Sequence, residues 1–168
     1  MQEIKSENPK EHWWMVNCRG KSILDLGCAY NDVDEEKTRE NKLGTPHHFI
    51  AQEPSAYLGV DSHAPDIEQF KAEFPQARFI CDSIDSSEKI RGYIIDSKPQ
   101  IIKCDIEGAE MFFLGLPKLS FVEELCIELH GPHIEKPFLE WANGLGFFLK
   151  ERAVLAKHRN ISVVHLCK

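Results

Sequence analysis

Short apolar segments alternate with helical patterns along most of the chain. Residues 22–26, 57–61 and 101–105 are largely apolar and end on, or next to, a polar residue, which is typical of strands buried in a parallel sheet. Apolar residues at helical spacing occur between such runs, as in 65–74, which Pro75 closes. This alternation predicts an α/β domain with helices on both faces of a parallel sheet.

The same pattern extends over the rest of the chain. Further strands are predicted at 77–83, 123–130, 146–150 and 160–167, and further helices at 47–53, 86–96 and 137–145. The connection between the last two strands is short and polar, so these strands should pair antiparallel. The expected sheet is therefore mostly parallel and seven-stranded, with a C-terminal antiparallel hairpin.

Two segments do not fit the alternation. Residues 30–46 are polar and aperiodic and predict a long irregular loop, which in a compact domain is usually a functional lid or disordered. Residues 1–21 begin polar and then carry an aromatic cluster at 12–16, which predicts a short helix on the sheet edge or a flap over a ligand. A chain of 168 residues is expected to form a single domain, 1–168.

Composition and charge narrow the classes of function. Hydrophobic residues at 42% and charged residues at 28% are usual for a globular protein. A net charge of −7 gives no overall attraction for nucleic acid, so no nucleic-acid partner is expected. With no run apolar enough to span a membrane and a polar amino terminus, we expect a cytoplasmic protein. The six cysteines lack Cys-x-x-Cys spacing and predict reduced core residues.

Four predicted strands close on, or next to, an aspartate. Asp25, Asp61, Asp82 and Asp105 should share one edge, because the carboxyl ends of parallel strands meet there. The first of these loops, Asp25-Leu26-Gly27-Cys28-Ala29, has one glycine and an acid, so it is poorly suited to a pyrophosphate. S-adenosylmethionine fits better, because it carries an ammonium, a sulfonium and no phosphate.

Two segments resemble motifs of known methyltransferases. The first loop resembles the Asp-x-Gly-x-Gly motif of class I S-adenosylmethionine-dependent methyltransferases, with Ala29 where the second glycine usually lies. The second segment is similar to the Lys-x-Asp-x-Glu-Gly-x-Glu signature of the FkbM-type family. Its fixed positions are filled by Lys103, Asp105, Glu107, Gly108 and Glu110. The resemblance implies the Rossmann-like class I methyltransferase fold and S-adenosylmethionine as cofactor.

The strand ends and the resemblance together assign roles in cofactor binding. The loop at 25–29 is expected at the methionine end, and Asp61 at the ribose, because a carboxylate matches a vicinal diol. The resemblance places Asp82 and Ser83 at the adenine. The predicted cofactor-binding residues are Asp25, Gly27, Cys28, Ala29, Asp61, Ser62, Asp82, Ser83 and Asp105.

Asp105 and His130 are the predicted catalytic residues. His130 ends the strand at 123–130 on the same face as Glu128, and its ordinary pKa suits a general base near neutral pH. Two alternatives stay open for His130: a structural histidine bonded to a loop carbonyl, or a metal ligand together with Glu128 and His133. We expect no metal at this site.

The predicted function is S-adenosylmethionine-dependent O-methylation of a small-molecule or sugar-type acceptor, as the FkbM resemblance implies. One alternative is a non-catalytic partner that retains the cofactor pocket. Another is an NAD(P)-binding oxidoreductase, against which the single glycine and the acid at Asp25 argue. No motif in the sequence selects the acceptor.

Overall fold

The computed structural model describes residues 3–4, 16–29, 45–156 and 161–168. Most of the predicted loop at 30–46 and of the aromatic cluster at 12–16 lies outside these residues. The strands are β1 (Glu3–Ile4), β2 (Ser22–Leu26), β3 (Ala56–Asp61), β4 (Arg78–Cys81), β5 (Ile101–Cys104), β6 (Glu124–His130), β7 (Phe148–Ala156) and β8 (Ile161–Cys167). The helices are α2 (Thr45–Ile50), α3 (Ala64–Glu73), α4 (Ser87–Ser97), the 3-10 helix η3 (Ala109–Gly115) and α5 (Pro132–Gly144).

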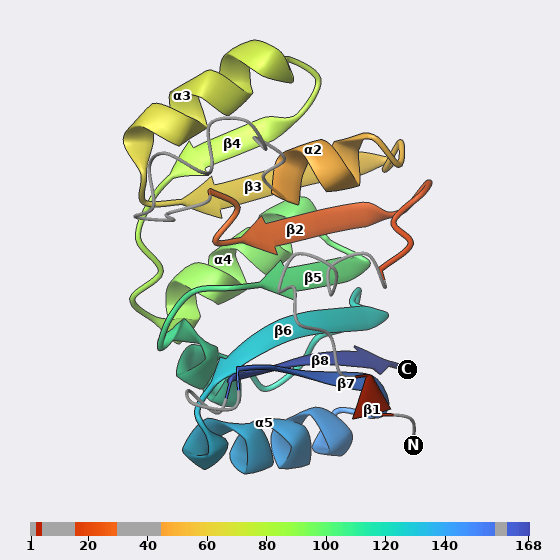
Figure 1. The fold of residues 1–168 in the computed structure, drawn as a ribbon. Coiled ribbons are helices and arrows are strands. Elements are labelled where there is room, and N and C mark those ends of the chain that lie inside the picture. The colour runs from red at the N-terminus through yellow and green to blue at the C-terminus, as the bar shows by residue number, and fades with distance from the viewer. Residues whose placement is uncertain (1–2, 5–15, 30–44, 157–160) are drawn as a thin grey trace.

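The described strands form one sheet in the order β1-β7-β8-β6-β5-β2-β3-β4 (Figure 1). Neighbours from β4 to β6 pair in parallel, and β8 lies antiparallel between β6 and β7. The seven predicted strands and the C-terminal antiparallel hairpin are therefore confirmed. The two-residue strand β1 adds a further parallel pairing to β7 and is too short to leave a pattern in the sequence.

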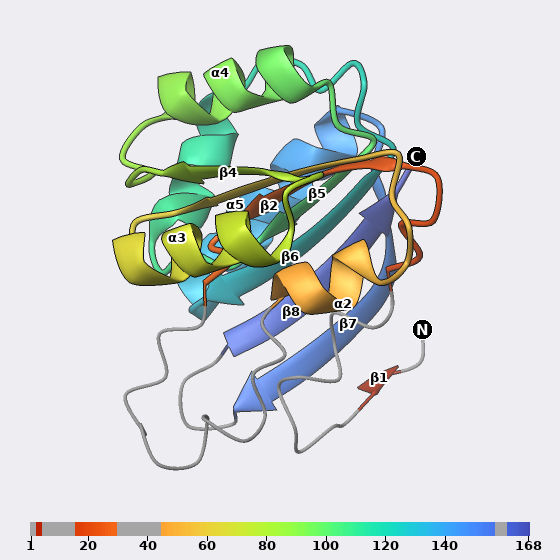
Figure 2. The same ribbon diagram turned by 90° about the horizontal axis from the view of Figure 1, so that it is seen from above.

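Helices cover both faces of the sheet (Figure 2). On β2, Leu24 belongs to the core that includes residues of α4, η3 and α5, while its neighbour Ile23 belongs to the core that includes residues of α2 and α3. Successive strand residues point to opposite faces, so alternate positions of a continuously apolar strand supply both cores. Among the described residues, no helix combines the length and apolarity needed to cross a membrane.

The direction of strand addition reverses between β2 and β5. The chain passes from β2 to β3 and β4 on one side, and from β5 to β6 on the other. In open α/β sheets such a reversal leaves a crevice beyond the carboxyl ends of the two strands, and ligands bind there. Leu26 and Cys104 are register partners, so the loops that follow them lie at this reversal, where a crevice is expected.

Helix α5 begins at Pro132, whereas the sequence pattern placed its start at residue 137. Pro137 lies inside the helix, whereas the sequence pattern predicts it as the first helical residue. The buried pair Ile134 and Phe138, four residues apart, marks the inward face on both sides of this proline. Strand β7 also runs beyond the predicted 146–150, to Ala156.

Candidate active site

The loop after β2 lies against the backbone of the loop after β5. Gly27 has a positive φ of 74°, and a Cβ at this position would lie 2.0 Å from the carbonyl oxygen of Asp105. The Gly27 N–H donates to the Val60 carbonyl at 2.9 Å, and the Asp105 N–H donates to the Leu26 carbonyl at 2.9 Å. The loops after β2 and β5 are therefore in direct contact, and a hydrogen bond to the end of β3 holds Gly27 in place.

Asp25 lies beneath this loop and is fully buried. Its Oδ2 accepts a hydrogen bond of 2.5 Å from the Tyr57 hydroxyl, and its Oδ1 lies 3.1 Å from Lys103 Nζ. The predicted contact between Asp25 and the methionine end of a ligand does not fit this position. The sequence pattern placed Asp25 at a strand end, but it lies inside β2, one residue before the last, with its side chain in the sheet interior.

Lys103 connects Asp25 to the loop above it. Its ammonium also donates to the Gly27 carbonyl at 2.6 Å, and the side chain is fully buried. Burial favours the neutral amine, yet the charges of Asp25 and Asp105 outweigh it and raise the pKa of Lys103. Lys103 is therefore a cation at neutral pH, and it fixes the loop from below. From the sequence, Lys103 is predicted only as the first fixed position of the FkbM-type signature, and its contacts with Asp25 and Gly27 are not predicted.

Asp61 joins the end of β3 to the loop after β2. Its Oδ2 accepts from the Ala29 N–H at 3.0 Å, and its Oδ1 accepts from the His63 N–H at 2.9 Å. Asp61 is 7% exposed, whereas its neighbour Ser62 is exposed. Each carboxylate oxygen has a second lone pair, so Asp61 can position the loop and still accept from a ligand.

The side chain of Cys28 points away from the crevice. It is buried, and a Cβ at Gly59 in β3 would lie 2.9 Å from its Sγ. Burial raises the pKa of the Cys28 thiol well above its usual range, and the nearby charge of Asp25 adds to this. Only the backbone of Cys28 is therefore suited to the predicted contact with a ligand.

The carboxylate of Asp82 is held by two side chains of α4. It accepts from Tyr93 Oη at 2.5 Å and from Lys89 Nζ at 2.9 Å, and these bonds lower its pKa. The next residue, Ser83, is exposed, and Ser86, not Ser83, caps α4 by accepting from the Lys89 N–H. A ligand at this strand end would have the Ser83 hydroxyl and the outer lone pairs of Asp82 available.

A cluster of acids surrounds His130 where β5 and β6 end. Its Nδ1 is hydrogen-bonded to the buried Glu110 of η3, and its Nε2 lies 3.5 Å from Glu128 Oε1. Donor atoms of Asp105, Glu128 and His130 lie within 4.8 Å of one another, close enough to share one cation. Glu107 of the signature is exposed on the turn instead. Glu128 belongs to this cluster, although the sequence analysis does not include it among the predicted catalytic or cofactor-binding residues.

Mutual repulsion and burial perturb the titration of this cluster. Burial and the charge of Asp105 raise the pKa of Glu128 to about 7. Burial likewise raises the pKa of Asp105, although Lys103 and His130 oppose it. The hydrogen bond that His130 donates to the Glu110 carboxylate raises the pKa of His130. A group that exchanges protons near neutral pH in a crevice is typical of acid–base catalysis.

Replacement of Glu128 by glutamine should flatten the pH dependence of stability. Because the folded-state pKa of Glu128 is raised to about 7, the folded protein binds more protons than the unfolded chain above pH ~4.5, and stability falls as pH rises toward 7. Urea unfolding at pH 5 and pH 8 should show a smaller loss of free energy for Glu128→Gln than for wild type. The exposed Glu88→Gln is the control, and an equal change in both variants would contradict the assignment.

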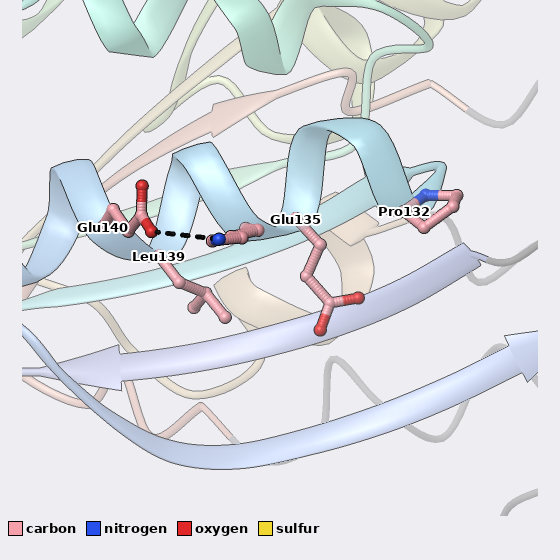
Figure 3. A pocket seen from close by; sticks show the side chains of 5 residues that line it. Pro132, Glu135, Leu139 and Glu140 are labelled. Atoms are coloured by element: carbon pink, nitrogen blue, oxygen red, sulfur yellow. Dashed lines mark ion pairs between the residues drawn. The ribbon is translucent and has the colours of Figure 1, made fainter.

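A hollow lies along one side of α5, and none of its lining residues belongs to this cluster (Figure 3). It is lined by Pro132, Glu135, Lys136, Leu139 and Glu140. Lys136 and Glu140 form an exposed ion pair of 3.8 Å across it. None of the predicted site residues lines it, so the loops at the carboxyl ends of β2 and β5, where those residues gather, are the better candidate site.

No protein-family model matches the chain, and no curated protein matches it in sequence. Solved structures do match. Aeropyrum pernix fibrillarin with natively bound S-adenosyl-L-methionine is 14% identical with a TM-score of 0.59, and the match covers 88% of this chain and 66% of that one. Magnesium protoporphyrin IX methyltransferase from Synechocystis, with bound SAH, is 15% identical with a TM-score of 0.58, covering 95% and 80%.

A Streptococcus pneumoniae protein in complex with S-adenosyl-L-methionine, assigned as a tRNA (m1A22) methyltransferase, is 13% identical with a TM-score of 0.60, and the match covers 91% of this chain and 68% of that one. The chain has the class I methyltransferase fold. It spans about two thirds of the Streptococcus and Aeropyrum chains. The predicted methyltransferase architecture is thus confirmed, whereas the FkbM-type subfamily stays a prediction.

Proposed function

We propose that the chain is an S-adenosylmethionine-dependent methyltransferase, with the cofactor in the crevice between β2 and β5. The observation that carries the proposal is the contact of Gly27 with the Asp105 backbone at the reversal of strand order. It brings the predicted cofactor loop beside the acidic cluster. Three structural neighbours contain S-adenosylmethionine or SAH on the same fold, which supports this choice of cofactor.

The residues around the crevice suit a cationic nucleoside. Asp61 would accept from the ribose hydroxyls, while the backbone of the loop from Gly27 to Ala29 would face the methionine end. Ser83 and the outer edge of Asp82 would meet the adenine. Asp105 would lie nearest the sulfonium, where its negative charge is favourable. In this proposal Asp25 acts indirectly, through Lys103 and the loop.

The reaction would transfer the sulfonium methyl to an acceptor oxygen. The acceptor's lone pair forms the new C–O bond as the C–S bond breaks, SAH leaves as a neutral thioether, and the hydroxyl proton passes to a base. Because the methyl is already activated, the main task of the protein is to hold acceptor and methyl in line, about 3 Å apart. Removal of the hydroxyl proton from the acceptor is the one step that requires a side chain.

His130 is the proposed base, and Glu110 orients it. Nδ1 of His130 donates to the Glu110 carboxylate, which leaves Nε2 directed toward Glu128, near Asp105 at the end of β5. This is the arrangement of a histidine base held by a carboxylate, with Asp105 as the alternative acceptor of the proton. The raised pKa of His130 means that its neutral form, and with it the rate, increases toward alkaline pH.

The acceptor class follows from the FkbM resemblance and is proposed to be a small molecule or sugar with a free hydroxyl. Structural neighbours are named for a tRNA and for a porphyrin, so the fold accommodates acceptors of very different size. All six cysteines are free, which supports the proposed cytoplasmic location. A panel of sugars, small alcohols and RNA, incubated with labelled S-adenosylmethionine, would identify the class. Cofactor binding without product from any acceptor would favour the non-catalytic alternative.

Calorimetric titration with S-adenosylmethionine tests the cofactor directly. Asp61→Ala should weaken binding by about 10–100-fold, because a charged hydrogen-bond acceptor is lost and the Ala29 N–H is left unpaired. Asp96→Ala, an exposed residue of α4 paired with Arg78, is the matched control and should bind as wild type does. Absence of heat with wild type, or binding of NAD(P) instead, would overturn the proposal.

A further inference from the structure

A second group of chemically reactive side chains lies where β6 begins and β8 ends, at the opposite end of the strands from the candidate active site. Glu124 is the first residue of β6, and Cys167 is the last of β8, its direct register partner. His165 precedes Cys167 by two residues and therefore points to the same face. The antiparallel pairing of two strand ends thus brings a carboxylate, an imidazole and a thiol together.

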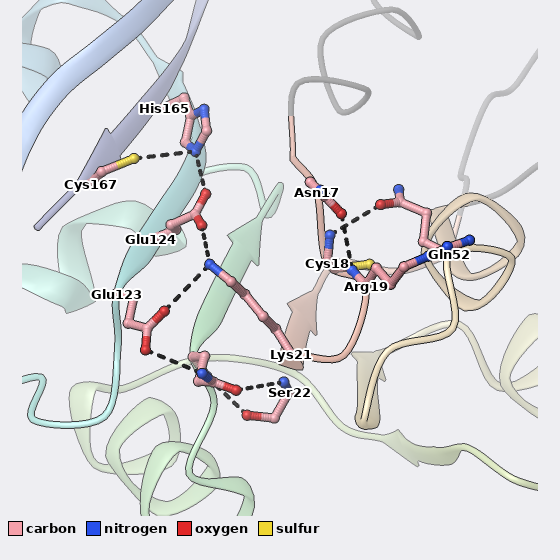
Figure 4. Close-up of polar contacts among 11 residues, drawn as sticks. Asn17, Cys18, Arg19, Lys21, Ser22, Gln52, Glu123, Glu124, His165 and Cys167 are labelled. Atoms are coloured by element: carbon pink, nitrogen blue, oxygen red, sulfur yellow. Dashed lines mark hydrogen bonds and ion pairs between the residues drawn. The ribbon is translucent and has the colours of Figure 1, made fainter.

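The donor atoms of these residues converge on one point (Figure 4). His165 Nε2 lies 2.8 Å from Glu124 Oε2 and 3.7 Å from Cys167 Sγ, and the three donors are within 4.8 Å of one another. In a tetrahedral zinc site with bonds of about 2.0–2.3 Å, ligand atoms lie about 3.3–3.7 Å apart. Small movements of the Glu124 side chain would bring the group to that geometry.

The chemistry of the donors selects the kind of ion. Nitrogen, sulfur and oxygen in one set favour zinc and related transition metals, whereas magnesium and calcium prefer oxygen alone. His165 is fully buried, but Cys167 is only half-buried and the Glu124 side chain is 15% exposed. The group is therefore held firmly at one side and can be reached from solvent at the other.

A neighbouring lysine and a bound proton compete with a metal ion for these three side chains. Lys21 Nζ lies 2.5 Å from Glu124 Oε1 and 3.3 Å from Glu123, so it occupies the other oxygen of Glu124. Burial and Glu124 raise the pKa of the Cys167 thiol, so a bound ion must displace its proton. If Nε2 binds metal, the ring proton moves to Nδ1, which has no hydrogen-bond partner among the described residues. These costs predict moderate affinity.

We propose that Glu124, His165 and Cys167 form a zinc-class metal site with three protein ligands and an open fourth position. The site lies outside the crevice between β2 and β5. It is independent of the proposed methyltransferase function, because none of its ligands is a predicted cofactor or catalytic residue.

Titration of the reduced full-length chain with cobalt(II) tests the site, because a cysteine thiolate bound to cobalt gives a charge-transfer absorption in the near ultraviolet. We expect this band to saturate at one equivalent and to disappear on addition of zinc. Cys167→Ser should lack the band, and His165→Gln should weaken cobalt binding at least tenfold. Cys81→Ser, an exposed cysteine in β4 at the far end of the sheet, is the matched control and should retain the band.

Lys21→Met separates a metal site from a merely structural cluster. Loss of the competing ammonium should tighten cobalt binding, since Glu124 is then free to turn both oxygens to the ion. The proposal is overturned if wild type gives no thiolate band, if Cys167→Ser keeps it, or if Lys21→Met, shown by circular dichroism to be folded, binds cobalt more weakly than wild type does.

Discussion

Replacement of Gly27 by alanine is expected to abolish measurable S-adenosylmethionine binding and to destabilise the fold. The positive φ costs a residue with a Cβ about 1–2 kcal/mol, and the methyl group would lie 2.0 Å from the Asp105 carbonyl oxygen. The loops after β2 and β5 must separate to admit it, and the surface that the two loops form together for the proposed cofactor is then distorted. We expect the dissociation constant to rise about 100-fold or more, equivalent to about 2.7 kcal/mol.

Gly92→Ala is the matched control for this prediction. Gly92 lies in α4, is exposed, and has open space around the position of a Cβ. Alanine there should stabilise the helix by roughly 0.5–1 kcal/mol and leave cofactor binding unchanged. Calorimetry and urea unfolding on both variants measure the two effects. Wild-type affinity in Gly27→Ala would show that the cofactor does not bind against this loop.

Lys103→Met is expected to have the largest effect on stability. It removes the cation from a fully buried ion pair and leaves the Tyr57 hydroxyl as the one partner of the Asp25 carboxylate among the described residues. Breaking a buried pair in this way costs about 3–5 kcal/mol, because an uncompensated charge stays in the interior. The free energy of unfolding should fall by that amount. Affinity for S-adenosylmethionine should also fall, because the Gly27 carbonyl loses its donor.

The double variant Asp25→Asn, Lys103→Met distinguishes the charge from the packing. With neither charge of this pair left in the interior, most of the lost stability should return, since an asparagine can still accept from Tyr57. The double-mutant cycle gives the coupling between the two residues as the departure from additivity. Additive losses would mean that the ion pair contributes little, and that the Lys103 side chain acts by filling space.

Most of the architecture could be predicted because the parallel strands are buried on both faces. In a strand such as Ile101–Cys104 every residue is buried, and its one charged residue, Lys103, is paired with Asp25. The lengths and spacing of these strands match a doubly wound sheet. The predictions were wrong at element boundaries where two local sequence signals conflict. Pro137 resembles a helix start, although the helix had begun one turn earlier with Pro132. The pairing of Glu3 and Ile4 with β7 depends on tertiary contacts that two residues cannot encode.

The grouping of candidate residues was easier to predict than their contacts. Asp61 and Asp105 follow strands on either side of β2 and lie at the same edge of the sheet, as acids at successive strand ends predict. Their role in binding a cofactor stays a prediction. The sequence pattern predicts that Asp25 contacts the ligand, because sequence alone does not show that Lys103 of the neighbouring strand β5 forms an ion pair with it. Similarly, Glu128 gained its perturbed pKa from burial beside Asp105, a proximity that arises only when β5 and β6 pair.

The tie between Lys103 and Gly27 has a consequence for the order of events during synthesis. Ribosomes release the β2 segment long before β5, so a nascent chain that ends near residue 100 has Asp25 but not its ammonium partner. Domains commonly complete folding as units once their late segments emerge. The loop after β2 is therefore held by a residue made 76 positions after Gly27, so a chain that ends before Lys103 lacks the hydrogen bond that fixes this loop.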